Sequence, residues 1–109
     1  MKYNLYITPT FERKLKKFLK KHPELEKEIE EKLNLLIKNP HNPSLKTHKL
    51  KGKLKNEWSI SLTFEYRILF VIEKEKIYLT NIGSHDETMS EIIKFKGYNI
   101  KIVEVKNGK

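Results

Sequence analysis

Two histidines, an arginine and a glutamate are the residues of this sequence best suited to acid–base chemistry on a phosphodiester: His48, Glu65, Arg67 and His85. RNA cleavage without a metal needs a base for the 2′-hydroxyl proton, an acid for the departing 5′-oxygen and positive charge on the phosphate. Histidine can transfer either proton near neutrality, and arginine stabilises developing phosphate charge. We expect His85 to act as acid or base, and His48 as its complement or as a phosphate-orienting donor.

Lysines occupy every second position of the segment that follows His48. This set, Lys49, Lys51, Lys53 and Lys55, alternates with Leu50 and Leu54. Because a strand has a side-chain period of two, we expect one face to carry four ammonium groups with His48 at its head, and the other face to enter the core. Together with Lys46, these lysines are the predicted RNA-binding residues. Lys51 and Lys53 are expected to join Arg67 on the phosphate.

Each of these residues also has a purely structural explanation. A histidine in a strand can be an ordinary surface residue, and Arg67 can pair with Glu65 or Glu57 across strands. The lysines can simply be solvated, as in Lys- and Glu-rich chains adapted to high temperature. Trp58 is expected in the core rather than as a platform on which bases stack.

The composition favours one cytoplasmic domain. The chain has 109 residues, a net charge of +9 and no cysteine, which suits a single domain over residues 1–109 and a reducing compartment. No apolar run is long enough for a signal peptide or a membrane span, so no membrane partner is expected. His22 and His41 lie beside prolines and receive no role. No metal-binding spacing is present, and neither a metal nor another cofactor is expected.

The charges are segregated along the chain. Residues 13–21 and 38–56 contain lysine or arginine but no acid, whereas glutamates gather between Glu24 and Glu31. Segregation of this kind leaves concentrated positive surface, which attracts phosphate backbones at long range.

Hydrophobic periodicity predicts an α+β fold. A strand is expected at 2–8, a helix from the Thr8-Pro9-Thr10 stop to about Lys21, and a second helix from Pro23 to about Lys38. After a loop at 39–44, strands are expected at 47–55, 57–64, 66–73 and 76–82. The two helices should form a hairpin packed on an antiparallel sheet of about four to five strands. Residues 98–109 are a possible extra edge strand (98–105) with a frayed tail.

Three motifs occur in order and at characteristic intervals: H-K-L-K-G from His48, E-Y-R-I-L-F from Glu65, and I-G-S-H-D from Ile82. Over about residues 3–89 the chain resembles the RelE/ParE toxin superfamily of type II toxin–antitoxin modules, and within it the branch represented by YafQ. The resemblance implies a RelE-like fold and a metal-independent, ribosome-dependent endoribonuclease that cleaves messenger RNA. It also implies neutralisation by an antitoxin peptide, in a toxin–antitoxin hetero-oligomer.

The resemblance also implies roles for single residues. His48 and His85 match catalytic histidines of the YafQ branch, Glu65 falls at a catalytic aspartate, and Arg67 matches an arginine that stabilises phosphate in RelE-type members. Ser61 stands where the branch has another histidine, and Met89 stands near a catalytic aromatic.

Two other functions remain open at this point. One is a non-catalytic inhibitor of DNA gyrase, as in the ParE branch, whose members resemble this fold but lack the acid–base residues. The other is an inactive relative that only binds its antitoxin.

Overall fold

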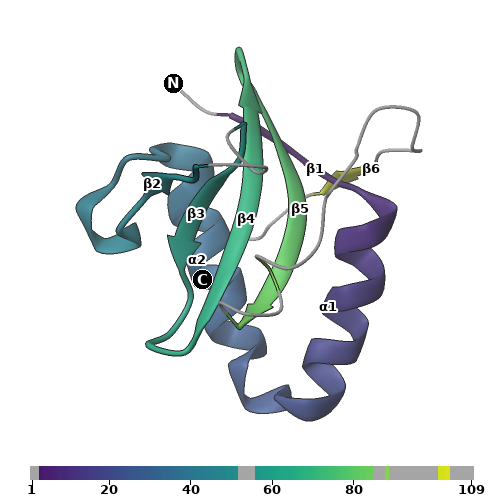
Figure 1. Cartoon of the computed structure of the whole chain (residues 1–109). Coiled ribbons are helices and arrows are strands. Elements are labelled where there is room, and N and C mark those ends of the chain that lie inside the picture. Colours follow the sequence, from purple (N-terminus) through teal and green to yellow (C-terminus); the bar gives the residue numbers. More distant parts are fainter. Residues whose placement is uncertain (1–2, 52–55, 85–87, 89–100, 104–109) are drawn as a thin grey trace.

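The computed structural model describes residues 3–51, 56–84, 88 and 101–103, which form an α+β fold (Figure 1). The helices are α1 (Pro9–Lys21), η1 (Pro23–Leu25), α2 (Glu26–Lys38) and η2 (Pro43–Leu45), where η marks a 3₁₀ turn. The strands are β1 (Asn4–Ile7), β2 (His48–Lys49), β3 (Trp58–Ser61), β4 (Tyr66–Glu73), β5 (Lys76–Ser84) and β6 (Lys101–Val103). The predicted fold class, an N-terminal strand and a helical hairpin on a sheet, is confirmed.

The six strands form one sheet in the order β2-β3-β4-β5-β1-β6. Neighbours from β2 to β5 are antiparallel, whereas β1 runs parallel to β5 and antiparallel to β6. The sheet is therefore mixed rather than wholly antiparallel. Two parallel strands must be joined by a crossover connection. The helical hairpin that follows β1 forms the first part of the crossover between β1 and β5. β6 lies within the segment expected to form an edge strand.

The start of α1 is fixed to the sheet by one threonine. The Thr8 hydroxyl accepts a hydrogen bond from the Phe11 amide at 3.2 Å and donates one to the Leu79 carbonyl at 2.9 Å. Pro9 follows at the first helical position, where its missing N–H costs nothing. Thr8 thus caps the helix and joins its first turn to β5.

One face of the sheet carries the core together with both helices. Its buried residues come from α1 (Phe11, Phe18), from α2 (Ile29, Leu33, Leu36) and from the strands (Leu5, Ile60, Ile68, Phe70, Ile77, Leu79, Ile82). Trp58 is half-buried and packs against this cluster, as predicted from its place in the chain. The basic side of α1 is consequently left on the outside.

The lysine-rich strand is much shorter than expected. The sequence predicts a strand over 47–55, but β2 contains only His48 and Lys49. β2 is an edge strand, so it can pair only with β3, and β3 begins at Trp58, opposite Lys49. Leu50 adds one further bond, because its N–H donates to the Glu57 carbonyl at 2.9 Å. Lys53 and Lys55 lie outside the described residues.

Candidate nucleic-acid interface

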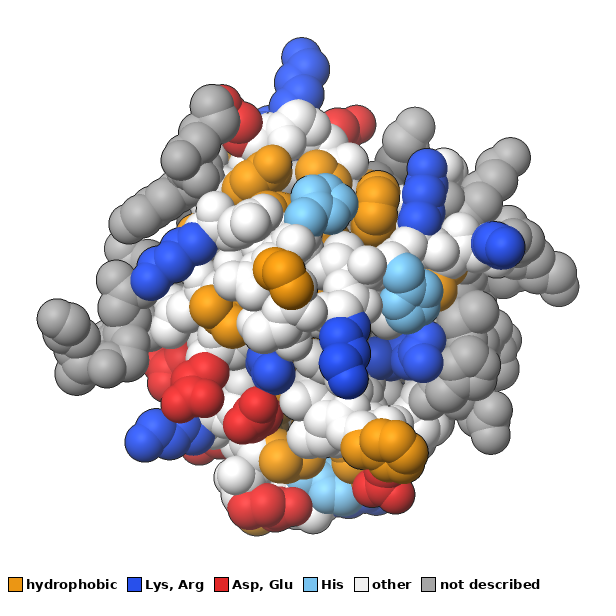
Figure 2. Space-filling model, turned by 90° about the vertical axis from the view of Figure 1, so that its left-hand side faces the viewer, with side chains coloured by type: hydrophobic (Ala, Val, Ile, Leu, Met, Phe, Trp, Pro, Cys, Tyr) orange, Lys and Arg blue, Asp and Glu red, His pale blue; other side chains and the backbone are white. Residues whose placement is uncertain are grey.

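A small cleft lies at the β2 side of the sheet, where β2, β3 and β4 adjoin. We call it the hairpin cleft, because most of its wall belongs to the β3–β4 hairpin. Its volume is about 310 Å³, and it is lined by Lys46, His48, Ser59, Ser61, Thr63, Phe64, Glu65, Tyr66 and Arg67. Figure 2 shows basic and histidine side chains next to one another on this side of the molecule. Three of the four predicted catalytic residues thus share one cleft.

His48 is exposed and its ring has a defined local partner. Its Nδ1 lies 3.3 Å from the carbonyl oxygen of Lys46, a residue held in the left-handed conformation at φ 53°. A carbonyl only accepts hydrogen bonds, so this interaction forms when Nδ1 carries the proton. In the neutral ring Nε2 then bears the free lone pair. His48 is therefore oriented to accept a proton at Nε2.

Arg67 is half-buried on β4, between two small residues. It pairs with Ser61 on β3 and with Gly83 on β5. Directly opposed strand residues share a face, so neither neighbour covers the guanidinium with a long side chain. The backbone of Gly83 has a positive φ of 155°, a conformation that glycine adopts more readily than other residues, so a glycine suits this position beside Arg67. Among the described residues, no carboxylate forms an ion pair with Arg67, so the predicted alternative of pairing with Glu65 or Glu57 is not found.

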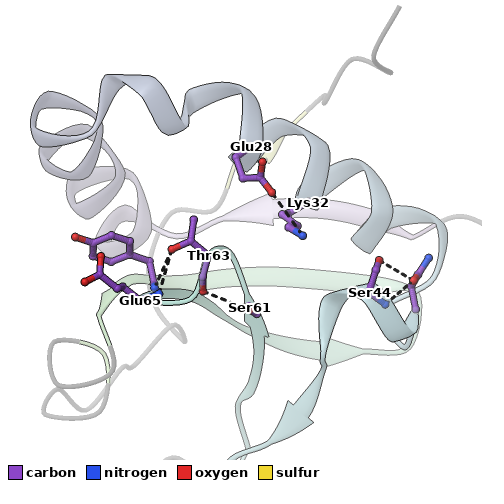
Figure 3. Close-up of polar contacts among 8 residues, drawn as sticks. Glu28, Lys32, Ser44, Ser61, Thr63 and Glu65 are labelled. Atoms are coloured by element: carbon purple, nitrogen blue, oxygen red, sulfur yellow. Dashed lines mark hydrogen bonds and ion pairs between the residues drawn. The ribbon is translucent and has the colours of Figure 1, made fainter.

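The turn between β3 and β4 carries Glu65, which belongs to the lining of the hairpin cleft. Figure 3 shows Glu65 at this turn, beside Thr63. The Thr63 hydroxyl accepts hydrogen bonds from the amides of Glu65 at 3.2 Å and Tyr66 at 3.3 Å. The Ser61 hydroxyl donates to the Thr63 carbonyl at 3.0 Å. Ser61 thus stabilises the turn.

His48 does not lie on the same face of the sheet as Lys49, the first lysine of the predicted basic strand. His48 opposes Ser59, whereas Lys49 opposes Trp58, so the two side chains lie on opposite faces of the sheet. The expectation that His48 heads the face of Lys49 is wrong, because adjacent strand residues point in opposite directions. The Lys49 Nζ lies 5.8 Å from the centroid of the Trp58 ring, at cation–π distance. Lys46 lines the cleft instead, and Lys51 is exposed beyond β2.

His85 lies outside the described residues. It directly follows Ser84, the last residue of β5, and Ser84 pairs with Tyr66 on β4. Its predicted role therefore stays a prediction.

A second, larger cleft lies between α1 and the ends of β4 and β5. We call it the helix cleft; its volume is about 820 Å³. Its basic lining consists of Arg13, Lys14, Lys17, Lys20 and Lys21, and the remaining wall of Phe18, His22, Tyr66, Ile82 and Ser84. No acidic residue belongs to this lining within the described part of the chain. The predicted positive surface of residues 13–21 thus forms one side of a concave site.

Tyr66 lines both clefts and is held by a residue that received no role from the sequence. The Tyr66 hydroxyl lies 3.1 Å from Nε2 of His22, whose Nδ1 lies 3.6 Å from a carboxylate oxygen of Glu24. Phe18 contacts both rings, edge-on against Tyr66 with a centroid distance of 5.0 Å. His22 and Tyr66 are 44 positions apart, so no local spacing could predict this pair.

Glu57 is the buried acid of the described structure. It lies just before β3, is 4% exposed and accepts a hydrogen bond from the Thr80 hydroxyl. Burial raises the pKa of this carboxyl above its usual value of 4.5, and the bond from Thr80 partly opposes that rise. Within the described ranges, no group of three or more histidine, aspartate or glutamate side chains could hold a metal ion.

Comparison with known structures shows a shared toxin fold. A copper-bound mutant toxin from Helicobacter pylori is 25% identical, with a TM-score of 0.62 over 80% of this chain and 98% of that chain. YafQ from Escherichia coli is 15% identical, with a TM-score of 0.68 over 79% and 97%. YafQ in the E. coli DinJ–YafQ toxin–antitoxin complex is also 15% identical, with a TM-score of 0.67 over 80% and 97%. No curated protein sequence matches.

The family model for YafQ, a bacterial toxin of type II toxin–antitoxin systems, matches residues 3–90. This chain belongs to that family, and the predicted resemblance to the RelE/ParE superfamily and its YafQ branch is confirmed. None of the described helices is both long and apolar enough to cross a membrane.

Proposed function

We propose that this toxin is a ribosome-dependent endoribonuclease that cleaves messenger RNA by metal-independent acid–base chemistry. The observation that carries the proposal is the hairpin cleft, which brings His48, Glu65 and Arg67 together with Lys46. A proton acceptor beside concentrated positive charge is what transphosphorylation of RNA requires. Membership of the YafQ toxin family supports this assignment.

In the proposed reaction, the phosphate of the scissile bond occupies the hairpin cleft. Nε2 of His48 takes the proton of the 2′-hydroxyl, and the 2′-oxygen then attacks the phosphorus. Arg67 and Lys46 stabilise the additional negative charge of the phosphorane. The 5′-oxygen departs with a proton from the acid, for which His85 is the proposed donor, and leaves a 2′,3′-cyclic phosphate. Glu65, which also belongs to the lining of the cleft, is the second candidate for proton transfer.

The proposed partners are the ribosome with its messenger RNA and a cognate antitoxin, in a toxin–antitoxin hetero-oligomer. YafQ, a structural neighbour, has been solved in complex with DinJ. The net charge of +9 favours an acidic antitoxin segment that folds on the toxin. The proposed compartment is the cytoplasm, where translation takes place.

The test is cleavage of a defined messenger RNA on purified ribosomes, with mapping of 5′ ends and analysis of the terminal phosphate. Arg67→Ala should lower the rate roughly 10²–10³-fold, as does loss of a group that stabilises transition-state charge. The matched control is Lys76→Ala, which removes one positive charge from the far end of β5.

Unaltered cleavage by Arg67→Ala would contradict the proposed site. Failure of DNA supercoiling without RNA cleavage would point instead to gyrase inhibition.

A further inference from the structure

Phe64 is an aromatic residue that the proposed chemistry leaves without a role. Its relative exposure is 104%, and it is the sole large hydrophobic side chain that is exposed within the described residues. The other phenylalanines in this part of the chain, Phe11, Phe18 and Phe70, are buried. Burial of a phenylalanine side chain stabilises a protein by about 1.5–3 kcal/mol. Phe64 contributes none of this stabilisation, which suggests that its exposure serves another purpose.

The turn holds Phe64 outward without using its side chain. Thr63 and Tyr66 close the turn, because the amides of Leu62 and Thr63 both donate to the Tyr66 carbonyl, at 2.9 and 3.2 Å. The side-chain bonds of Ser61 and Thr63 brace the same loop (Figure 3). The Phe64 ring therefore stands on a pre-formed support, and its replacement leaves the hydrogen bonds of this support in place.

The surroundings of Phe64 indicate what the ring could bind. It belongs to the lining of the hairpin cleft, together with the positive groups of Lys46 and Arg67 and with His48. Positive groups that hold a phosphate, beside an aromatic ring with a free face, are the two components of sites for single-stranded nucleic acid. The lining also contains the carboxylate of Glu65, which the two positive groups of Lys46 and Arg67 outnumber. The cleft therefore favours an anion such as a phosphate, and the ring adds a surface for a neighbouring base.

We infer that Phe64 is a stacking platform for an unpaired nucleobase of the RNA whose phosphate lies in the hairpin cleft. The inference rests on the proposed function and assigns this residue to recognition of the substrate. A base bound there anchors the RNA at the turn between β3 and β4, and thereby helps to fix which phosphate faces His48. Because every base has a π face, the platform contributes affinity and position more than sequence preference.

The variant Phe64→Leu tests whether the Phe64 side chain binds a nucleobase or an apolar side chain of a peptide. Leucine offers comparable apolar area but no ring face, so it would still accept a hydrophobic residue of an antitoxin. Phe64→Leu should therefore lose base stacking, while Phe64→Tyr should retain it. Both variants keep the hydrogen bonds of the turn and should fold like the wild type.

The experiment measures binding of a short single-stranded RNA oligonucleotide and of ribosomes carrying a defined messenger RNA. Phe64→Leu should weaken binding about 5- to 150-fold, the range that corresponds to one stacked base, whereas Phe64→Tyr should bind like the wild type. In a series of oligonucleotides with one abasic position each, one member should bind the wild type more weakly and show no further loss with Phe64→Leu. Phe64→Tyr is the matched control for Phe64→Leu, and Lys76→Ala is the control for the loss of charge in Arg67→Ala.

The outcomes distinguish the inference from the function on which it rests. If the wild type binds RNA and Arg67→Ala loses binding, but Phe64→Leu binds like the wild type, the inference alone is overturned. An equal loss in Phe64→Leu and Phe64→Tyr, or a loss that affects only antitoxin binding, also overturns it. If the wild type binds neither the oligonucleotide nor the programmed ribosome, the proposed function fails as well.

Discussion

The two clefts of this toxin differ in chemistry although Tyr66 lines both. The hairpin cleft is small and combines a histidine, a carboxylate and an arginine, so it contains groups that can move protons and stabilise phosphate. The helix cleft is more than twice as large, and its charged lining consists of basic residues of α1. Positive charge alone positions a nucleic acid without cutting it. We therefore propose that the hairpin cleft performs the chemistry and that the helix cleft binds the nucleic-acid backbone.

Replacement of His48, the proposed general base, should have the largest effect on cleavage. His48→Gln should lower the rate of messenger RNA cleavage on ribosomes roughly 10²–10⁴-fold, as is typical when a positioned acid–base group is removed. Binding of the programmed ribosome should change far less, because glutamine keeps a polar group in the cleft. His41→Gln is the matched control, since His41 is exposed and contacts the Trp58 ring rather than the cleft.

Cleavage that persists in His48→Gln would remove the chemical distinction between the clefts. A loss of binding equal to the loss of cleavage would instead make His48 a binding residue.

Reversal of charge in the helix cleft should have the opposite signature. Lys17→Glu/Lys20→Glu should weaken ribosome binding, and the slope of log K against log salt should become shallower by about 0.7–0.9 for each phosphate that the variant no longer neutralises. The rate of cleavage in the bound complex should stay close to that of the wild type. Lys27→Glu/Lys38→Glu, the same double charge reversal at two exposed lysines of α2, tests for non-specific electrostatics.

If the salt dependence of binding is the same in both variants, the helix cleft has no specific part in binding. The net charge of the whole molecule would then account for the effect.

The hairpin cleft could be predicted in part because some of its determinants are local. The range 66–73 was expected as a strand from its apolar and β-branched residues, and β4 has these bounds. Thr8, Phe11 and Phe18 likewise mark a capped, amphipathic helix. Such patterns depend only on neighbours along the chain, so they are visible before the fold is known.

The features that the sequence does not predict depend on which strands pair with one another. The length of β2 follows from where β3 begins, and the parallel pairing of β1 with β5 follows from the crossover. The bond between His22 and Tyr66 joins the helical hairpin to β4 through an interaction that no periodicity contains. The face of His48 could have been predicted, since strand alternation already separates it from Lys49.

The shared wall of the clefts should be stabilised modestly by the hydrogen bond between Tyr66 and His22. Tyr66→Phe removes the hydroxyl at 3.1 Å from His22 and should lower the free energy of unfolding by about 0.5–1.5 kcal/mol. The ring contact with Phe18 should persist, because it does not use the hydroxyl. Denaturant titration of the variant beside Tyr6→Phe on β1 measures this, and equal stability of Tyr66→Phe and wild type would show that the bond contributes nothing net.

The last and smallest effect concerns the scaffold of the hairpin cleft and its dependence on pH. Glu57 lies just before β3, and its raised pKa means that the folded state binds the proton more tightly than the unfolded chain. Stability from this group is therefore complete below the usual value of 4.5 and is lost as the pH rises through the folded-state pKa. Glu57→Gln keeps an acceptor for Thr80 without a charge to bury, so its advantage in stability should grow as the pH rises through that window.

Denaturant titrations across this window, with the exposed Glu73→Gln as control, separate the burial of a charge from the removal of a hydrogen bond. If Glu57→Gln were less stable than the wild type even near neutral pH, the ionised carboxylate would be contributing a net favourable interaction there. The negative charge of Glu57 would then stabilise the start of β3 rather than destabilise it. His48 pairs with Ser59 on β3, so any weakening of the pairing between β2 and β3 should also disturb the orientation of His48. The helix cleft is lined mainly by α1 and should remain intact.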